Sequence, residues 1–199
     1  MSTQLYLIRH APAAVASGCL VGSSDVPLSG KGQEPLAAIV PLLDGLDRWY
    51  CSPMLRTRQT LEKLQSSGLD IADVQIDSRL REIDFGRWEG KSFQDIAEQE
   101  PDVIVAWQAY ADFVFPEGES VRGFTRRVRA LLDDYSAADD QRIAVMTHGG
   151  VIRTMICLAL GIPESKYLLF DVQPASLTML TLFDQGGVLN GLNVQGRLK

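Results

Sequence analysis

Apolar residues along this chain follow two spacings, and each spacing predicts a kind of secondary structure. Residues 5–8 and 142–146 are short, almost continuous apolar runs, which are typical of strands buried on both faces of a parallel sheet. Similar but weaker patterns predict strands at 46–51, 74–76, 176–183 and 188–194. A turn with the sequence DQGG joins the last two. The pattern indicates an α/β sheet with residues 5–8 as a central strand.

Apolar residues at helical spacing predict helices at 31–43, 52–66, 92–112, 120–135 and 151–160. Pro35 and Pro41 interrupt the first helix and Pro101 divides the third, because proline lacks the amide hydrogen that a helix interior needs. Ser52 as the N-cap and Pro53 as the first helical residue start the second helix. Helices therefore follow the strands along much of the chain.

Two stretches have no regular period. Residues 11–27 contain many small residues and form a long loop after the first strand, and loops of this length usually have a function. Residues 80–90, with the sequence LREIDFGRWEG, mix charged and aromatic side chains, as the wall of a pocket does. Both stretches are candidates for a binding site.

Composition limits the partners. With 46% hydrophobic and 22% charged residues, the chain can bury one core, and we expect residues 1–199 to form a single domain. The formal net charge of -6 argues against nucleic acid or an anionic membrane as a partner, because both need a cationic surface. An anionic ligand would need positive charge that is gathered locally.

The cysteines and the N-terminus indicate a reducing compartment. Cys19, Cys51 and Cys157 lack the spacing of a metal site, and the N-terminus lacks the apolar core of a signal peptide. We therefore expect a cytoplasmic protein. Residues 151–162 are the best candidate for a membrane span, but they are too short and contain Arg153, so we interpret them as a core helix.

The chain has two histidines, and each follows an apolar strand: His10 after LYLIR and His148 after IAVMT. If both strands are central and parallel, both imidazoles lie at the same edge of the sheet, where ligands of α/β sheets bind. The alternative is that one or both are capping residues or satisfied polar groups at strand ends. The pattern by itself leaves both interpretations open.

Arginines favour an anion site at this edge. Arg9 adjoins His10, and Arg56 lies in the first turn of the predicted helix 52–66, where a cation is unfavourable beside the helix dipole. A bound anion resolves that conflict, because free helix amides and an arginine together bind phosphate or carboxylate. Alternatively, Arg56 pairs with an Asp or Glu of a neighbouring loop. We interpret Arg58 as a surface charge.

Five segments together resemble one family. They are RHA at 9–11, SPMLRTRQT at 52–60, LREIDFGRWEG at 80–90, PEGES at 116–120 and THGG at 147–150. In this order they are similar to the histidine phosphatase superfamily, which includes the cofactor-dependent phosphoglycerate mutases. Residues 18–29, GCLVGSSDVPLS, are most similar to the short phosphatases of the alpha-ribazole phosphatase type. The resemblance spans nearly the whole chain.

The resemblance implies a three-layer α/β/α domain of the phosphoglycerate mutase-like kind, with a mostly parallel sheet. It implies that His10 attacks phosphorus to give a phosphohistidine, while Arg9, Arg56, a protonated His148 and Gly149 bind the phosphoryl group.

The resemblance assigns the proton donor to Glu82, with Glu119 as the rival carboxylate, and Gly22 and Ser23 are possible substrate contacts. From the residues alone, the favoured interpretation of Glu82 is a salt-bridge partner of Arg81 or Arg87, and that of Glu119 is an acid at a helix start.

The first loop departs from the family pattern. Where the family usually has glycine, an acidic residue, a hydroxyl residue and later an asparagine, this chain has Ala11, Pro12, Ala13 and Ala16. The usual polar contacts are therefore missing, or Ser17, Ser23 or Ser24 supplies them. This departure affects which substrate alcohol the loop can contact, and it leaves the residues that bind the phosphoryl group unchanged.

The sequence thus predicts a metal-independent phosphomonoester hydrolase without a cofactor, acting on a small-molecule phosphate such as alpha-ribazole phosphate. A metal site is disfavoured, because HxxH, HExxH and CxxC spacings are absent from the sequence and Arg9 and Arg56 repel a divalent cation. One alternative is a phosphoglycerate mutase-like phosphotransferase, for which only residues 92–115 offer a partial lid. Another is a phospho-ligand binding module without catalysis.

Overall fold

The computed structural model describes residues 2–32, 35–107, 112–138 and 141–195, and contains one six-stranded sheet in the order β3-β2-β4-β1-β5-β6. The strands are β1 (Thr3–Arg9), β2 (Arg48–Cys51), β3 (Gln75–Ile76), β4 (Arg142–Thr147), β5 (Leu177–Phe183) and β6 (Gly186–Val194). Strands β3, β2, β4 and β1 pair in parallel, and β5 pairs antiparallel with both β1 and β6. The predicted mostly parallel sheet is confirmed.

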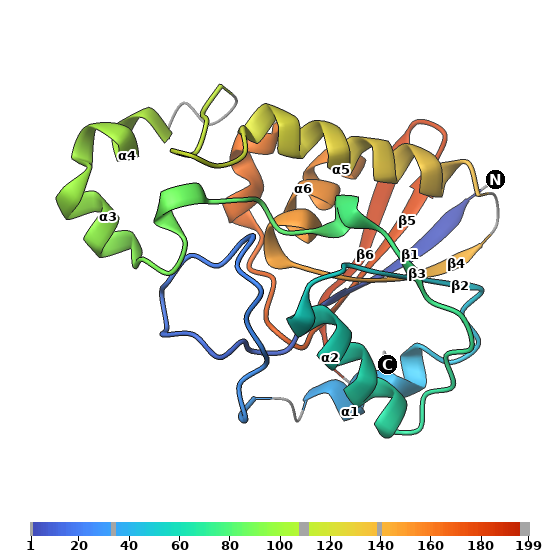
Figure 1. Cartoon of the computed structure of the whole chain (residues 1–199). Coiled ribbons are helices and arrows are strands. Elements are labelled where there is room, and N and C mark those ends of the chain that lie inside the picture. The colour runs from blue at the N-terminus through green and yellow to red at the C-terminus, as the bar shows by residue number, and fades with distance from the viewer. Residues whose placement is uncertain (1, 33–34, 108–111, 139–140, 196–199) are drawn as a thin grey trace.

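Helices cover both faces of the sheet. Figure 1 shows α5 (Val121–Ser136) and α6 (Gly149–Leu160) on one face and α1 (Pro35–Ile39) and α2 (Leu55–Ser66) on the other. Alternate residues of β1 explain this arrangement: Leu5 and Leu7 belong to the core under α5 and α6, whereas Tyr6 and Ile8 belong to the core under α1 and α2. The strand is apolar throughout because both of its faces are buried, as predicted for a central strand.

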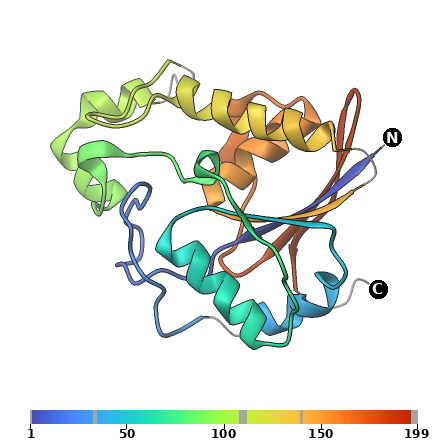
Figure 2. The same ribbon diagram turned by 45° about the vertical axis from the view of Figure 1, so that its right-hand side comes forward.

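The remaining elements lie outside the three layers. Helices α3 (Phe93–Gln99) and α4 (Pro101–Trp107) project beyond the sheet near the loop that follows β1, as both ribbon views show (Figures 1 and 2). The chain also forms the short 3-10 helices η1 (Val40–Leu42), η2 (Ser78–Leu80), η3 (Gly86–Trp88) and η4 (Glu164–Leu169). No helix in the described ranges combines the length and apolarity that a bilayer span needs.

Two helix predictions are wrong at their starts. The helix expected at 31–43 is only α1 followed by η1, because Pro35 begins the helix, where a missing amide hydrogen costs nothing, and Pro41 lies near the start of η1. The helix expected from Ser52 begins instead at Leu55 with Met54 as the N-cap. The other predicted helices and strands are present within a few residues. Pro101 divides α3 from α4 as expected, and residues 108–111 of that prediction lie outside the described residues.

Candidate active site

The two histidines meet at the carboxyl edge of the sheet. Arg9 of β1 is aligned with Thr147 of β4, so the next residue of each strand is a histidine at the same level. His10 is 8% exposed and His148 is fully buried, and their ring centroids lie 5.1 Å apart. The structure therefore brings together the two histidines that the strand pattern placed at one edge.

His10 is a neutral imidazole, and the hydrogen bond that it forms with a described residue involves Nδ1. Its Nδ1 lies 2.7 Å from the carbonyl oxygen of Ala11, and because a carbonyl oxygen only accepts, Nδ1 carries the proton. Burial, helped by the nearby cations Arg9 and Arg56, lowers the pKa of His10 to about 3. Nε2 therefore keeps its lone pair at neutral pH, as a nitrogen nucleophile requires.

His148 has the opposite tautomer. Its Nδ1 accepts from Nε of Arg56 at 3.3 Å, and its Nε2 donates to the hydroxyl of Ser52 at 2.8 Å. Burial, the neighbouring His10 and the two arginines lower the pKa of His148 well below its usual value. The expectation of a protonated His148 is therefore wrong, because its surroundings already hold positive charge and exclude water.

Arg56 is fully buried and bonds to the long loop rather than to a carboxylate. Its Nη1 donates to the Ser24 carbonyl at 2.8 Å and its Nη2 to the Gly22 carbonyl at 2.7 Å. Desolvation lowers the pKa of its guanidinium, which still remains charged, as arginine does in proteins. The alternative in which Arg56 pairs with a neighbouring Asp or Glu does not occur in the described part of the chain.

Arg9 keeps an unused donor. Its Nη1 donates to the Val172 carbonyl at 2.5 Å, whereas its buried Nε has no hydrogen-bond partner among the described residues. Gly149 allows this placement, because a Cβ at that position would lie 3.2 Å from the Arg9 Nε. A buried donor without a partner costs free energy unless a ligand satisfies it. Arg9 thus offers a hydrogen bond and a charge to an anion.

Glu82 reaches the same edge from the segment after η2. Its Oε2 accepts from the Gly150 amide at 2.8 Å, and its Oε1 accepts from the Ile83 amide at 3.1 Å. A Cβ at position 150 would lie 2.3 Å from Oε1, so glycine is needed for the carboxylate to lie there. The alternative salt bridge to Arg87 is absent, because Arg87 pairs with Glu100. Glu82 lies in the site, beside α6.

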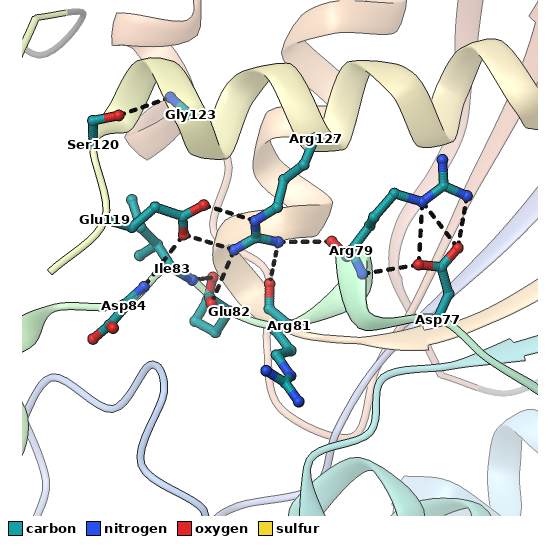
Figure 3. Close-up of polar contacts among 10 residues, drawn as sticks. All are labelled: Asp77, Arg79, Arg81, Glu82, Ile83, Asp84, Glu119, Ser120, Gly123 and Arg127. Atoms are coloured by element: carbon teal, nitrogen blue, oxygen red, sulfur yellow. Dashed lines mark hydrogen bonds and ion pairs between the residues drawn. The ribbon is translucent and has the colours of Figure 1, made fainter.

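Glu119 is paired with Arg127 of α5 (Figure 3). Both of its carboxylate oxygens accept from the Arg127 guanidinium at 2.8 Å, and one also accepts weakly from the Asp84 amide. The neighbouring Ser120 caps α5 through the Gly123 amide, so Glu119 lies at a helix start as the alternative interpretation held. What distinguishes Glu119 from Glu82 is the two-point ion pair with Arg127, which gives Glu119 a structural role at the start of α5.

The amides of Gly22 and Ser23 are already bonded inside the protein. Both amides donate to the carboxylate of Glu89, at 2.9 to 3.0 Å, and the Ser23 hydroxyl donates to Asp84 at 2.8 Å. Glu89 was not predicted as a site residue; its only signal was its position in the segment 80–90. It fixes the loop whose carbonyls hold Arg56.

The described residues contain no group of three or more His, Cys, Asp or Glu side chains placed to hold a metal ion. The site instead combines a neutral imidazole, two nearby arginines and the carboxylate of Glu82. This set suits transfer of a phosphoryl group, in which positioning and cancellation of charge do most of the work.

Comparison with known proteins identifies the family. The chain matches the model of the histidine phosphatase superfamily (branch 1) over residues 5–195, and it belongs to this superfamily. It is 30% identical over 199 residues to phosphoserine phosphatase 1 of Hydrogenobacter thermophilus, covering 96% of this chain and 92% of that relative. It is 28% identical to an adenosylcobalamin/alpha-ribazole phosphatase of Salmonella typhimurium, covering 96% of both chains.

A solved structure agrees with this result. The alpha-ribazole phosphatase of Shigella flexneri superposes with a TM-score of 0.83 at 25% identity, covering 98% of this chain and 99% of that chain. The family and the fold that the sequence motifs implied are confirmed. The protein is a phosphatase of the histidine phosphatase superfamily.

The buried histidines predict a loss of stability in mild acid. The unfolded chain binds protons at each histidine below about pH 6.5, whereas the folded chain leaves His10 neutral down to about pH 3 and His148 neutral as well. The free energy of unfolding should therefore fall as the pH drops below 6.5, by about 2 kcal/mol at pH 5 for His10, with a further loss in the same direction from His148.

Urea unfolding at several pH values between 7.5 and 5 measures this effect. Most carboxylates titrate below pH 5, so they contribute little to the change over this pH range. The variant His148→Gln should show about half of the wild-type slope. A free energy of unfolding that stays constant over this range would contradict the buried, neutral state of both histidines.

Proposed function

We propose that this protein hydrolyses phosphomonoesters of small molecules through a phosphohistidine at His10, with Glu82 as proton donor and without a metal ion. The observation that carries the proposal is a neutral His10 whose Nε2 holds the lone pair, near the fully buried Arg56 and near Arg9, whose Nε has no hydrogen-bond partner among the described residues. The alternatives named from the sequence, a mutase and a binding module, use the same phosphate site.

The reaction has two displacements. In the first, Nε2 of His10 forms a bond to phosphorus while the ester P–O bond breaks, and the departing oxygen takes the proton of Glu82. In the second, Glu82 takes a proton from water as the water oxygen attacks phosphorus, the N–P bond breaks, and inorganic phosphate leaves. Arg9 and Arg56 balance the charge on the phosphoryl oxygens in both steps. His148 holds Arg56 and Ser52 in place as a neutral partner.

Two observations favour hydrolysis without a metal over the alternatives. The arginines already supply the positive charge that a divalent ion would supply, and among the described residues the Glu82 carboxylate forms no salt bridge and is held by backbone amides. A module that only binds phosphate needs neither a free imidazole nitrogen nor this carboxylate. Phosphate release that outpaces isomerisation of phosphoglycerate would separate the hydrolase from a mutase.

The substrate remains a choice among phosphate esters. The relatives named above are phosphoserine and alpha-ribazole phosphatases. Alpha-ribazole phosphate is the candidate that the sequence of residues 18–29 favours. Gly22 and Ser23 in that segment support the site through Glu89 and Arg56, so we infer that the substrate contacts of this loop come from its exposed side chains.

Varying the leaving group tests the role of Glu82. An alkoxide needs a proton to depart, whereas a nitrophenolate leaves largely unaided, so Glu82→Gln should slow the phosphorylation step by about a hundredfold or more for an alkyl phosphate and far less for nitrophenyl phosphate. The measurement is the burst of released alcohol, in the presence of a chelator, because total turnover also includes the water step.

The control is Glu62→Gln, which changes an exposed carboxylate on α2. It should leave both burst rates unchanged. Equal losses for both esters in Glu82→Gln would make Glu82 a structural residue, and loss of the burst on chelation would overturn the metal-free mechanism.

A further inference from the structure

A cleft of about 470 Å³ opens beside the phosphate site. Glu82 and Gly150 are among the residues that line it, and Glu82 donates the proton to the leaving oxygen in the proposed reaction, so the cleft adjoins that oxygen. The alcohol half of a substrate bound at His10 must therefore extend into this cleft. Its walls come from the segments around η3, from α3 to α5, and from η4.

The walls of this cleft are mostly apolar. Aromatic rings line it at Phe85, Phe93, Trp107, Phe115, Phe124 and Tyr167. The charged side chains that line it are Glu82 and Arg153, and the Nε of Arg153 donates to the Phe170 carbonyl at 2.7 Å. A charged amino or carboxylate group in this cleft would lose water and meet few partners in return.

The rim of the cleft exposes large apolar side chains. Phe93 is 51% exposed and Leu168 is 69% exposed, and both line the cleft. Contiguous exposed apolar surface beside a polar site marks a ligand-binding region, because a ligand that covers this surface removes it from water. The rim therefore favours a ligand that is large enough to reach it.

We propose that the alcohol half of the substrate is a bulky aromatic ring system that does not carry an ammonium and a carboxylate together. Small zwitterionic esters such as phosphoserine are then poor substrates. This inference rests on the proposed function. It assigns selectivity to apolar contact along the cleft, with Arg153 available to one polar group of the ring system.

Three primary alkyl phosphates test the proposal, because their leaving groups are matched: 2-naphthylethyl phosphate, O-phosphoserine and ethyl phosphate. We expect kcat/KM for the naphthyl ester to exceed that for phosphoserine by about a hundredfold, the gain typical of burying one aromatic ring system. Leu168→Ala should lower kcat/KM for the naphthyl ester about fivefold, mainly through KM, and leave ethyl phosphate unchanged.

Leu169→Ala is the matched control, since Leu169 is 73% exposed on the same 3-10 helix and does not line the cleft. Phosphoserine as the better ester, or equal effects of the two leucine variants, would overturn the proposal. Binding of the three corresponding phosphonates, measured by calorimetry, ranks the ligands without turnover. Absence of turnover on all three esters would refute the proposed function, whereas equal phosphonate affinities would refute the ring preference.

A separate observation concerns Arg127 on α5. Its guanidinium donates to the carbonyls of Arg79, Arg81 and Glu82, at 2.6, 2.6 and 3.1 Å, in addition to the carboxylate of Glu119 (Figure 3). These five contacts match the five N–H donors of arginine, so the group has none left for a substrate. They tie α5 to the segment that carries Glu82.

We infer that Arg127 is a positioning residue for Glu82. The backbone of Glu82 is fixed by Arg127 and its carboxylate by the Gly150 amide, so the two contacts together set where the proton is delivered. Proton transfer depends on this placement at the scale of a hydrogen bond. This inference also rests on the proposed function.

A double-mutant cycle tests it. Arg127→Gln should slow the burst for an alkyl phosphate at least tenfold more than the burst for nitrophenyl phosphate, a selectivity that general loss of structure does not produce. In the Glu82→Gln background it should add no further selectivity, because the acid is already absent. Arg126→Gln, at the exposed neighbouring position, should change neither rate.

Equal losses for both esters in Arg127→Gln, or additive losses in the double variant, would overturn the positioning role. If Glu82→Gln itself shows no leaving-group effect, the proposed function fails instead.

Discussion

Positive charge buried without an ion pair is the constraint on which the site depends. Arg56 is fully buried, Arg9 lies close enough for the two cations to interact, and neither pairs with a carboxylate in the described ranges. Removing a charge from water is costly, and carbonyl oxygens of Gly22, Ser24 and Val172 offset only part of that cost. A phosphate ester supplies the missing negative charge. The chain has a net charge of -6, so this local concentration of cations sets the site apart from the rest of the protein.

The same buried charge decides the states of the neighbouring groups. Burial and the nearby cations keep both imidazoles neutral, which leaves His10 with the lone pair that the proposed nucleophile needs and His148 as a hydrogen-bonding partner. Close packing then places the loops: a Cβ at Gly22 would lie 1.7 Å from the Ile83 carbonyl oxygen, so only glycine lets the long loop approach the segment that carries Glu82. Glu89 holds that loop through its amides, and the loop in turn holds Arg56.

Local sequence patterns predicted the parts of this site that depend on the ends of strands. Parallel strands meet at one edge, so an apolar run followed by His10 and another followed by His148 were enough to place both imidazoles together. Ser52 was predicted as a helix cap because its local sequence suits one, but its hydroxyl bonds to His148 from a distant segment. The neutrality of His148 and the roles of Glu89 and Arg127 depend on burial and on contacts between loops, which no local spacing encodes. The first helix was misjudged because proline is tolerated where a helix starts.

Direct detection of the covalent intermediate tests the central claim most closely. The enzyme is mixed with a slowly hydrolysed ester, quenched in alkali, where phosphohistidine is stable and acyl phosphate is not, and digested for mass spectrometry. The account predicts one phosphoryl group per chain on His10, absent from the variant His10→Asn and formed in the presence of a chelator. Label on Ser52 or His148, or turnover without any covalent phosphate, would contradict it.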